Sequence, residues 1–177
     1  TAARDRVQVA FEARDWAAVR VACREDATFE DRRRLALLSG DREWWVAYLQ
    51  SIAEGRNVRL ERRLVATFGD RVDLQRGTWR GGPTDGPFEI EFLAVTEADD
   101  SGNIAGYVAF DVDDWQAADR EARARWFARD ARAAAVVGPD TEFIDAGNAH
   151  DPTRARAVFA DDIVVNDRRR AGMGVIE

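Results

Sequence analysis

The spacing of hydrophobic residues changes along the chain, and each change predicts a different element. Residues 2–14 and 16–24 carry apolar side chains three and four positions apart, which is the period of an amphipathic helix. Residues 27–35 alternate between apolar and charged positions, as a half-buried strand does. A second helical stripe covers residues 41–54 and ends at Gly55, a residue that suits the turn after a helix. The chain is therefore predicted to begin with two short helices, a strand and a third helix.

The middle of the chain is predicted to be a series of strands. Alternating segments cover residues 58–68, 71–80, 88–97 and 103–111, and turn-forming residues separate them. A long helix rich in Arg and Ala then begins near residue 113. Helices that precede a run of antiparallel strands predict an α+β fold.

Part of the sequence occurs twice. Residues 13–34 recur without a gap as residues 149–170, with 8 of 22 aligned positions identical, and both copies end in DRRR. Since only seven residues follow the second copy, we expect a complete domain at residues 1–125. Residues 126–177 are expected to hold a linking helix and the N-terminal part of a second, incomplete copy. The truncated repeat and the absence of an initiator Met indicate a piece of a longer polypeptide.

Composition narrows the range of functions. All 26 basic residues are Arg, and the net charge of −7 argues against nucleic-acid binding, which needs a basic surface. No apolar run approaches the roughly 20 residues of a membrane span, so we expect a soluble, cytoplasmic protein with no membrane partner. Cys23 is the only cysteine and aligns with Phe159, which indicates packing rather than reactivity. One His and scattered acids predict no metal site, and no cofactor is expected.

The segment REDATFEDRRR, followed by GDREWWVAYLQ, resembles the opening of SnoaL-like and ketosteroid isomerase-like domains of the NTF2-like superfamily. The resemblance extends to about residue 115. It implies a cone in which a curved antiparallel sheet wraps around the N-terminal helices and encloses a pocket. It also implies a homodimer through the outer face of the sheet, or a pseudo-dimer between the two copies. Because this fold serves binding modules, isomerases, cyclases and epoxide hydrolases, it does not select a chemistry.

The resemblance places Asp31 at the position of the isomerase's general base. The two oxyanion-hole donors of the isomerase fall on Val7 and Ala94, which cannot donate, so steroid-type isomerisation is not expected. Arg33 shares the strand face of Asp31, and Asp111 on the last strand should also face the pocket. The three are predicted to form an acid–arginine–acid cluster. Such a cluster either activates water, as in epoxide hydrolases of this fold, or is a buried ion pair that fixes the strand.

The predicted ligand-binding residues are mainly aromatic, which suits a small apolar or cyclic molecule. They are Arg33, Trp44, Tyr48, Trp79, Phe92 and Tyr107. Strand alternation directs Arg32 and Arg34 away from Arg33, so these two are expected to pair with acids on the outer face or at a dimer contact. Glu89 and Glu91 project to that face if Ile90, Phe92 and Ala94 point inward.

Three functions follow from these residues. The first is a SnoaL-like small-molecule-binding domain that acts as a non-catalytic accessory or sensory module of a larger chain. The second is a hydrolase or isomerase that uses Asp31 as general base, with Asp111 as its partner. The third is a purely structural role through pseudo-dimer formation between the copies.

Overall fold

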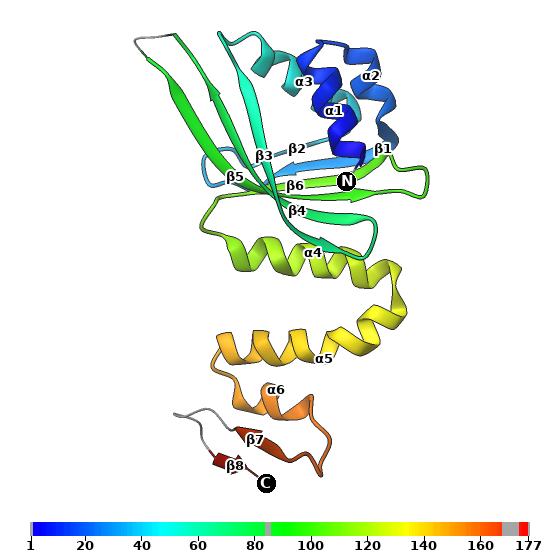
Figure 1. Ribbon diagram of the computed structural model, residues 1–177, viewed down its shortest axis with the longest axis vertical. Helices are drawn as coiled ribbons and strands as arrows, with labels where there is room; N and C mark the ends of the chain where they lie inside the picture. The colour runs from blue at the N-terminus through cyan, green and yellow to red at the C-terminus, as the bar shows by residue number, and fades with distance from the viewer. Residues whose placement is uncertain (1, 84–85, 168–173, 177) are drawn as a thin grey trace. The chain divides into compact units, whose positions relative to one another are not determined.

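The computed structural model describes residues 2–83, 86–167 and 174–176. The chain forms two compact units, residues 1–126 and residues 127–177 (Figure 1). Among the described residues, every helix is too short or too polar to cross a lipid bilayer.

The first unit starts with helices and continues with strands, in the predicted order. Its first elements are α1 (Ala2–Glu12), α2 (Trp16–Val21), β1 (Cys23–Asp31), β2 (Leu38–Gly40) and α3 (Arg42–Ala53). The elements that follow are β3 (Arg59–Phe68), β4 (Val72–Gly81), β5 (Phe88–Ala98), β6 (Ile104–Phe110) and α4 (Trp115–Arg129). The carboxylates of Asp15 and Asp41 accept backbone N–H bonds at the starts of α2 and α3, which fixes where both helices begin.

The six strands of this unit form one curved, open sheet in the order β2-β1-β6-β5-β4-β3 (Figure 1). Neighbouring strands are antiparallel except β1 and β6, which are parallel. The α+β architecture predicted from the sequence is therefore observed, and the sheet curves around the N-terminal helices.

One predicted strand is misplaced. Strand β1 begins at Cys23 and ends at Asp31, whereas the alternation predicted residues 27–35. The chain leaves the sheet because the N–H groups of Ala36 and Leu37 both bond to the carbonyl of Arg33, which closes a tight turn. Arg33 therefore lies in this turn and not on the strand.

Part of the sheet is buried on both faces, whereas β3 and the first residues of β5 are largely exposed. On the inner face, Phe92 and Ala94 pack with Phe29 and the residues of α1 and α3. On the outer face, Leu93 and Val95 pack with Ala118 and Ala122 of α4, both of which are fully buried. Figure 1 shows α1 to α3 on one side of the sheet and α4 on the other. Helix α4 therefore covers part of the face predicted to form a homodimer, and the homodimer stays a prediction.

The second unit contains α5 (Ala131–Asn148), α6 (Pro152–Ala157), β7 (Val165–Asp167) and β8 (Gly174–Ile176), and β7 pairs antiparallel with β8. The aligned residues Arg14 and His150 have φ angles of 56° and 55°. Asp151 caps α6 as Asp15 caps α2. The repeat therefore preserves the local corner between two helices. A tandem copy of the whole domain and its boundary stay predictions, and the second RRR lies outside the described residues.

Candidate functional site

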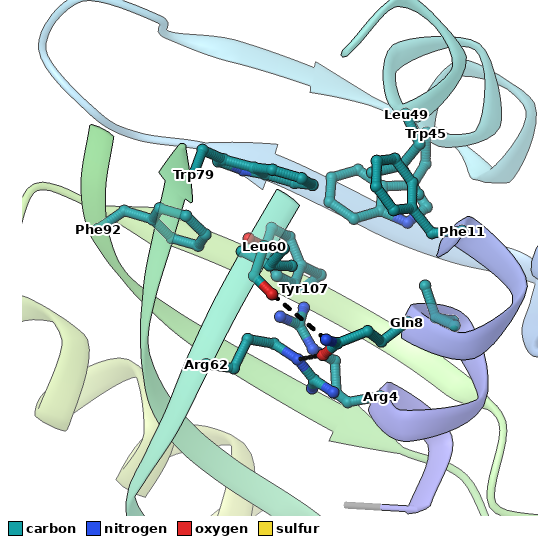
Figure 2. A pocket seen from close by; sticks show the side chains of 11 residues that line it. Arg4, Gln8, Phe11, Trp45, Leu49, Leu60, Arg62, Trp79, Phe92 and Tyr107 are labelled. Carbon is teal, nitrogen blue, oxygen red and sulfur yellow. Dashed lines mark hydrogen bonds between the residues drawn. The ribbon is translucent and has the colours of Figure 1, made fainter. Parts of the chain in front are cut away.

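A cavity lies between α1, α3 and the inner face of the sheet (Figure 2). Six elements, α1, α3, β3, β4, β5 and β6, contribute aromatic, aliphatic, polar and cationic side chains to its wall. The lining residues are Arg4, Val7, Gln8, Phe11, Trp45, Leu49, Leu60, Arg62, Trp79, Phe92 and Tyr107. The cavity has a volume of about 30 Å³. It has room for only about two water molecules.

Aromatic rings form most of the cavity wall and hold one another in place. The ring centroids of Phe11 and Trp79 lie 5.3 Å apart in an edge-on arrangement. Those of Trp45 and Tyr107 lie 4.6 Å apart. The ring of Phe92 fits over Gly77 of β4, where a Cβ atom would approach the ring to 2.3 Å. These contacts, typical of aromatic clusters, fix the shape of the apolar side of the cavity.

Two arginines from different elements form the polar side of the cavity. Figure 2 shows Arg4 and Arg62 together with Gln8, across from the rings of Trp79 and Phe92. Arg4 comes from the buried face of α1 and is only 5% exposed. Its guanidinium carbon lies 4.8 Å from the centroid of the Tyr107 ring. Among the described residues, no carboxylate forms an ion pair with Arg4.

The guanidinium of Arg62, in contrast, donates hydrogen bonds to two amide side chains and one carboxylate. It donates to the side-chain oxygens of Gln8 at 2.5 Å, Gln75 at 3.1 Å and Asp5 at 3.0 Å. Burial lowers the pKa of Arg62, and the nearby charge of Arg4 lowers it further, while Asp5 and the buried Asp73 oppose the shift. The two cations therefore repel each other inside a poorly solvated space.

Two further polar groups belong to the cavity wall. The indole Nε1 of Trp45 is buried and has no hydrogen-bond partner among the described residues. An unsatisfied donor of this kind costs about 1–3 kcal/mol. Burial raises the pKa of the Tyr107 hydroxyl, although Arg4 opposes the shift. At neutral pH, Tyr107 is therefore a hydrogen-bond donor and not a base.

Asp31 is buried beside the cavity and is held in an ion pair with Arg33. The Nε and Nη2 atoms of Arg33 bind the two oxygens of Asp31 at 2.8 and 2.5 Å, and the Arg33 backbone N–H donates to the same carboxylate at 3.2 Å. These bonds raise the pKa of Arg33. Neither residue lines the cavity. Besides Asp31, Arg33 contacts the ring of Phe92, 5.4 Å from its centroid, and the hydroxyl of Tyr48.

The predicted cluster of Asp31, Arg33 and Asp111 forms only in part, because Asp31 pairs with Arg33 whereas Asp111 is bonded by Arg34, and a catalytic role of Asp31 and Asp111 stays a prediction. Asp111 accepts hydrogen bonds from the backbone N–H and the Nε of Arg34, both at 2.9 Å, and the backbone bond is the main cause of its lowered pKa. The difference arises because β1 ends at Asp31, so the following turn brings Arg34 rather than Arg33 to the end of β6. Arg34 also bonds Asp113.

Arg32, the first arginine of the DRRR motif, pairs with acidic residues as predicted. Arg32 pairs with Glu30 of its own strand and with Glu121 of α4. The carboxylates of Asp111, Asp113 and Asp114 lie within 4.8 Å of one another, but Arg34 already binds two of them. Arg34 therefore accounts for the clustering of these carboxylates without a metal ion.

The predicted ligand-binding residues divide into two groups. Trp79, Phe92 and Tyr107 line the cavity, whereas Arg33, Trp44 and Tyr48 lie outside its lining. Trp44 stacks on Tyr48 with centroids 5.3 Å apart. The other lining residues were not among the predicted ligand-binding residues; they are Arg4, Val7, Gln8, Phe11, Trp45, Leu49, Leu60 and Arg62.

A signal for the missed residues was present in the sequence. Arg4 lies at helical spacing from Val7 and Phe11, on the apolar face of α1. Arg62 lies two positions after Leu60 and therefore on the same face of β3. A charged residue on a face that the pattern marks as buried is a candidate for function.

The sequence matches no known family model and no curated protein. The structure does resemble solved structures. PrhC from Penicillium brasilianum superposes with a TM-score of 0.54 and 17% identity over 72% of this chain and 90% of PrhC. The epoxide hydrolase/cyclase-like enzyme SalBIII has a TM-score of 0.51 and 17% identity over 61% of this chain and 86% of its own.

A third similar structure identifies the fold by name. It is a protein from Catenulispora acidiphila with a ketosteroid isomerase-like fold, solved in complex with trimethylamine. Its TM-score is 0.50 and its identity 12%, over 60% of this chain and 82% of its own. The predicted NTF2-like fold is therefore confirmed. At these identities the similarity concerns the fold and not the activity.

Proposed function

We propose that the first unit is a SnoaL-like binding module that takes a small molecule into the cavity, without catalysis of its own, as an accessory or sensory part of a larger chain. The observation that carries the proposal is the cavity itself. Its wall combines the rings of Phe11, Trp45 and Trp79 with polar groups gathered on one side. Small-molecule sites are typically apolar cavities with a few convergent polar groups.

The composition of the lining supports binding rather than catalysis. Among the described lining residues there is no carboxylate and no histidine. A general base needs an atom within hydrogen-bond reach of the substrate. Asp31 does not reach the cavity, and both of its oxygens are bound by Arg33. The geometry therefore gives no support to Asp31 as a general base for a ligand in this cavity.

The similar structures support small-molecule binding as a use of this fold. One of them holds trimethylamine, and SalBIII acts in pyran ring formation in the polyether salinomycin. The narrow enclosed volume of about 30 Å³ limits what fits without movement. A ring compound would have to occupy the mouth as well and displace side chains around it, so its binding should perturb the wall tryptophans.

The proposal is tested by titration with small ring compounds while tryptophan fluorescence is followed. The variant Val7→Phe fills the cavity from α1 and should abolish the change. Val9→Phe is the matched control, because Val9 is 68% exposed on the opposite side of the same helix. If no compound perturbs the fluorescence, or if both variants respond alike, the proposal fails.

A further inference from the structure

The charge on the polar side of the cavity indicates which class of ligand it takes. We propose that the ligand is a small monocarboxylate with an apolar or cyclic body, and that Arg4 binds its carboxylate group. The inference rests on the proposed function, since it identifies the ligand of the same cavity.

The first argument is the isolation of the Arg4 guanidinium. Arg4 is 5% exposed, so water does not solvate it well. Among the described residues its neighbour is Tyr107, whose ring centroid lies 4.8 Å from the guanidinium carbon and whose hydroxyl forms a hydrogen bond with Arg4. A guanidinium has five N–H groups, and those that Tyr107 does not engage can bind a carboxylate through two parallel hydrogen bonds. A buried cation is normally paired, and within the described residues this one has no carboxylate.

The second argument is the contrast with Arg62. Gln8, Gln75 and Asp5 hold Arg62 in a fixed orientation. Its acidic partner Asp5 has a side chain that is 75% exposed, so much of that negative charge is screened by water. Asp73 is buried in β4 and also acts on Arg62. Arg62 therefore adds positive potential near Arg4, while its own N–H groups are already bonded to Gln8, Gln75 and Asp5.

The third argument is the remaining donor in the wall. The indole Nε1 of Trp45 is buried without a hydrogen-bond partner among the described residues. Trp45 and Arg4 both line the cavity, so its mainly apolar wall holds a cation without a carboxylate partner and an indole donor without an acceptor among the described residues. A ligand that fits this wall supplies acceptor oxygens to Arg4 and carbon to the aromatic rings. A carboxylate supplies both the acceptors and the negative charge that Arg4 lacks.

The experiment compares acids with their matched amides by isothermal titration calorimetry. The pairs are propionate and propionamide, benzoate and benzamide, and cyclohexanecarboxylate and its amide. Each pair has nearly the same size and differs in charge. We expect at least one carboxylate to bind about 10- to 100-fold more tightly than its amide, the range for a charge-assisted hydrogen bond.

Variants assign the preference to Arg4. Arg4→Gln should remove it by weakening carboxylate binding and leaving amide binding unchanged. Arg4→Lys keeps the charge but not the paired donors, so it should retain part of the preference. Arg6→Gln is the control, because it removes the same charge from an exposed position of α1.

The outcomes separate this inference from the proposed function. If amides bind as tightly as carboxylates, or if Arg4→Gln leaves the preference intact, the carboxylate assignment is overturned and small-molecule binding still stands. If none of the carboxylates binds, the assignment is overturned as well. In that case, neutral ring compounds alone decide whether the cavity binds ligands.

Discussion

The ion pair between Asp31 and Arg33 should act as a structural lock, and Asp31→Asn tests this. Asparagine has nearly the shape of aspartate but carries no charge, so the variant leaves the Arg33 guanidinium without its counter-ion. The side chains of Asp31 and Arg33 are only 6% and 14% exposed. Removal of one partner from a buried pair costs about 3–5 kcal/mol. Arg33 keeps its contacts with Tyr48 and Phe92, so we expect a loss near the lower end, about 3 kcal/mol.

Two further variants show whether the loss comes from the unpaired charge. The double variant Asp31→Leu/Arg33→Met removes both charges and should recover most of the lost stability, because no buried ion remains to be desolvated. Glu91→Gln breaks the bidentate pair of Arg76 and Glu91 on the outer face, where the side chains are 47% and 38% exposed. This exposed pair should contribute less than about 1 kcal/mol.

The free energy of unfolding is measured by urea titration followed by tryptophan fluorescence. All six tryptophans lie in residues 1–126, so the signal reports on the first unit. A loss below about 1 kcal/mol for Asp31→Asn, or a double variant no more stable than the single one, would refute the structural interpretation. The burial of Asp31 would then need an explanation other than stability, and general-base catalysis would be the first alternative to test.

Four further predictions use the same protein. Ala118→Glu places a carboxylate between α4 and the sheet, where Ala118 is 0% exposed, and should cost at least about 3 kcal/mol in the urea titration; the exposed control Ala124→Glu should stay within about 0.5 kcal/mol. Gly77→Ala places a Cβ 2.3 Å from an aromatic ring of β5 and should cost about 1–3 kcal/mol by the same measurement. Burial raises the pKa of Cys23 to about 12, so a thiol reagent at pH 8 should modify the folded protein far more slowly than the urea-unfolded protein; equal rates would contradict this. Without ligand, Arg4→Met should leave the free energy of unfolding unchanged or raise it by up to about 2 kcal/mol, because it removes an unpaired buried charge; a large loss would make Arg4 a structural residue.

The elements of the fold were predictable where the periodicity of the sequence matched the burial. The stripe around Trp45 and Leu49 predicted α3, and the alternation through Phe92 and Ala94 predicted the inner face of β5. The end of β1 was not predictable from alternation, because the same alternation continues into a turn. That turn is set by hydrogen bonds to the carbonyl of Arg33, which the sequence does not reveal.

The role of α4 was hidden by its composition. Its buried residues are the small side chains of Ala118 and Ala122, and most of its other positions are charged or polar. Hydrophobic periodicity detects large side chains on a helix, but here the sheet supplies them. Leu74, Val95 and Val108 fill the contact. The helix was therefore interpreted as a connection, whereas it packs on the outer face of the sheet.

The candidate site could not be predicted from single positions, because it is defined by which buried arginines have an acidic partner in the folded structure. The DRRR motif drew attention because its charges are adjacent in sequence, yet the three-dimensional structure neutralises each of them with an acid. Arg4 stands alone in an apolar stripe, and within the described residues it has no such acid. An unpaired buried charge lowers the stability of the empty domain, and a ligand that binds this charge stabilises the folded state again. The most informative charge for the function of this domain is therefore the isolated one.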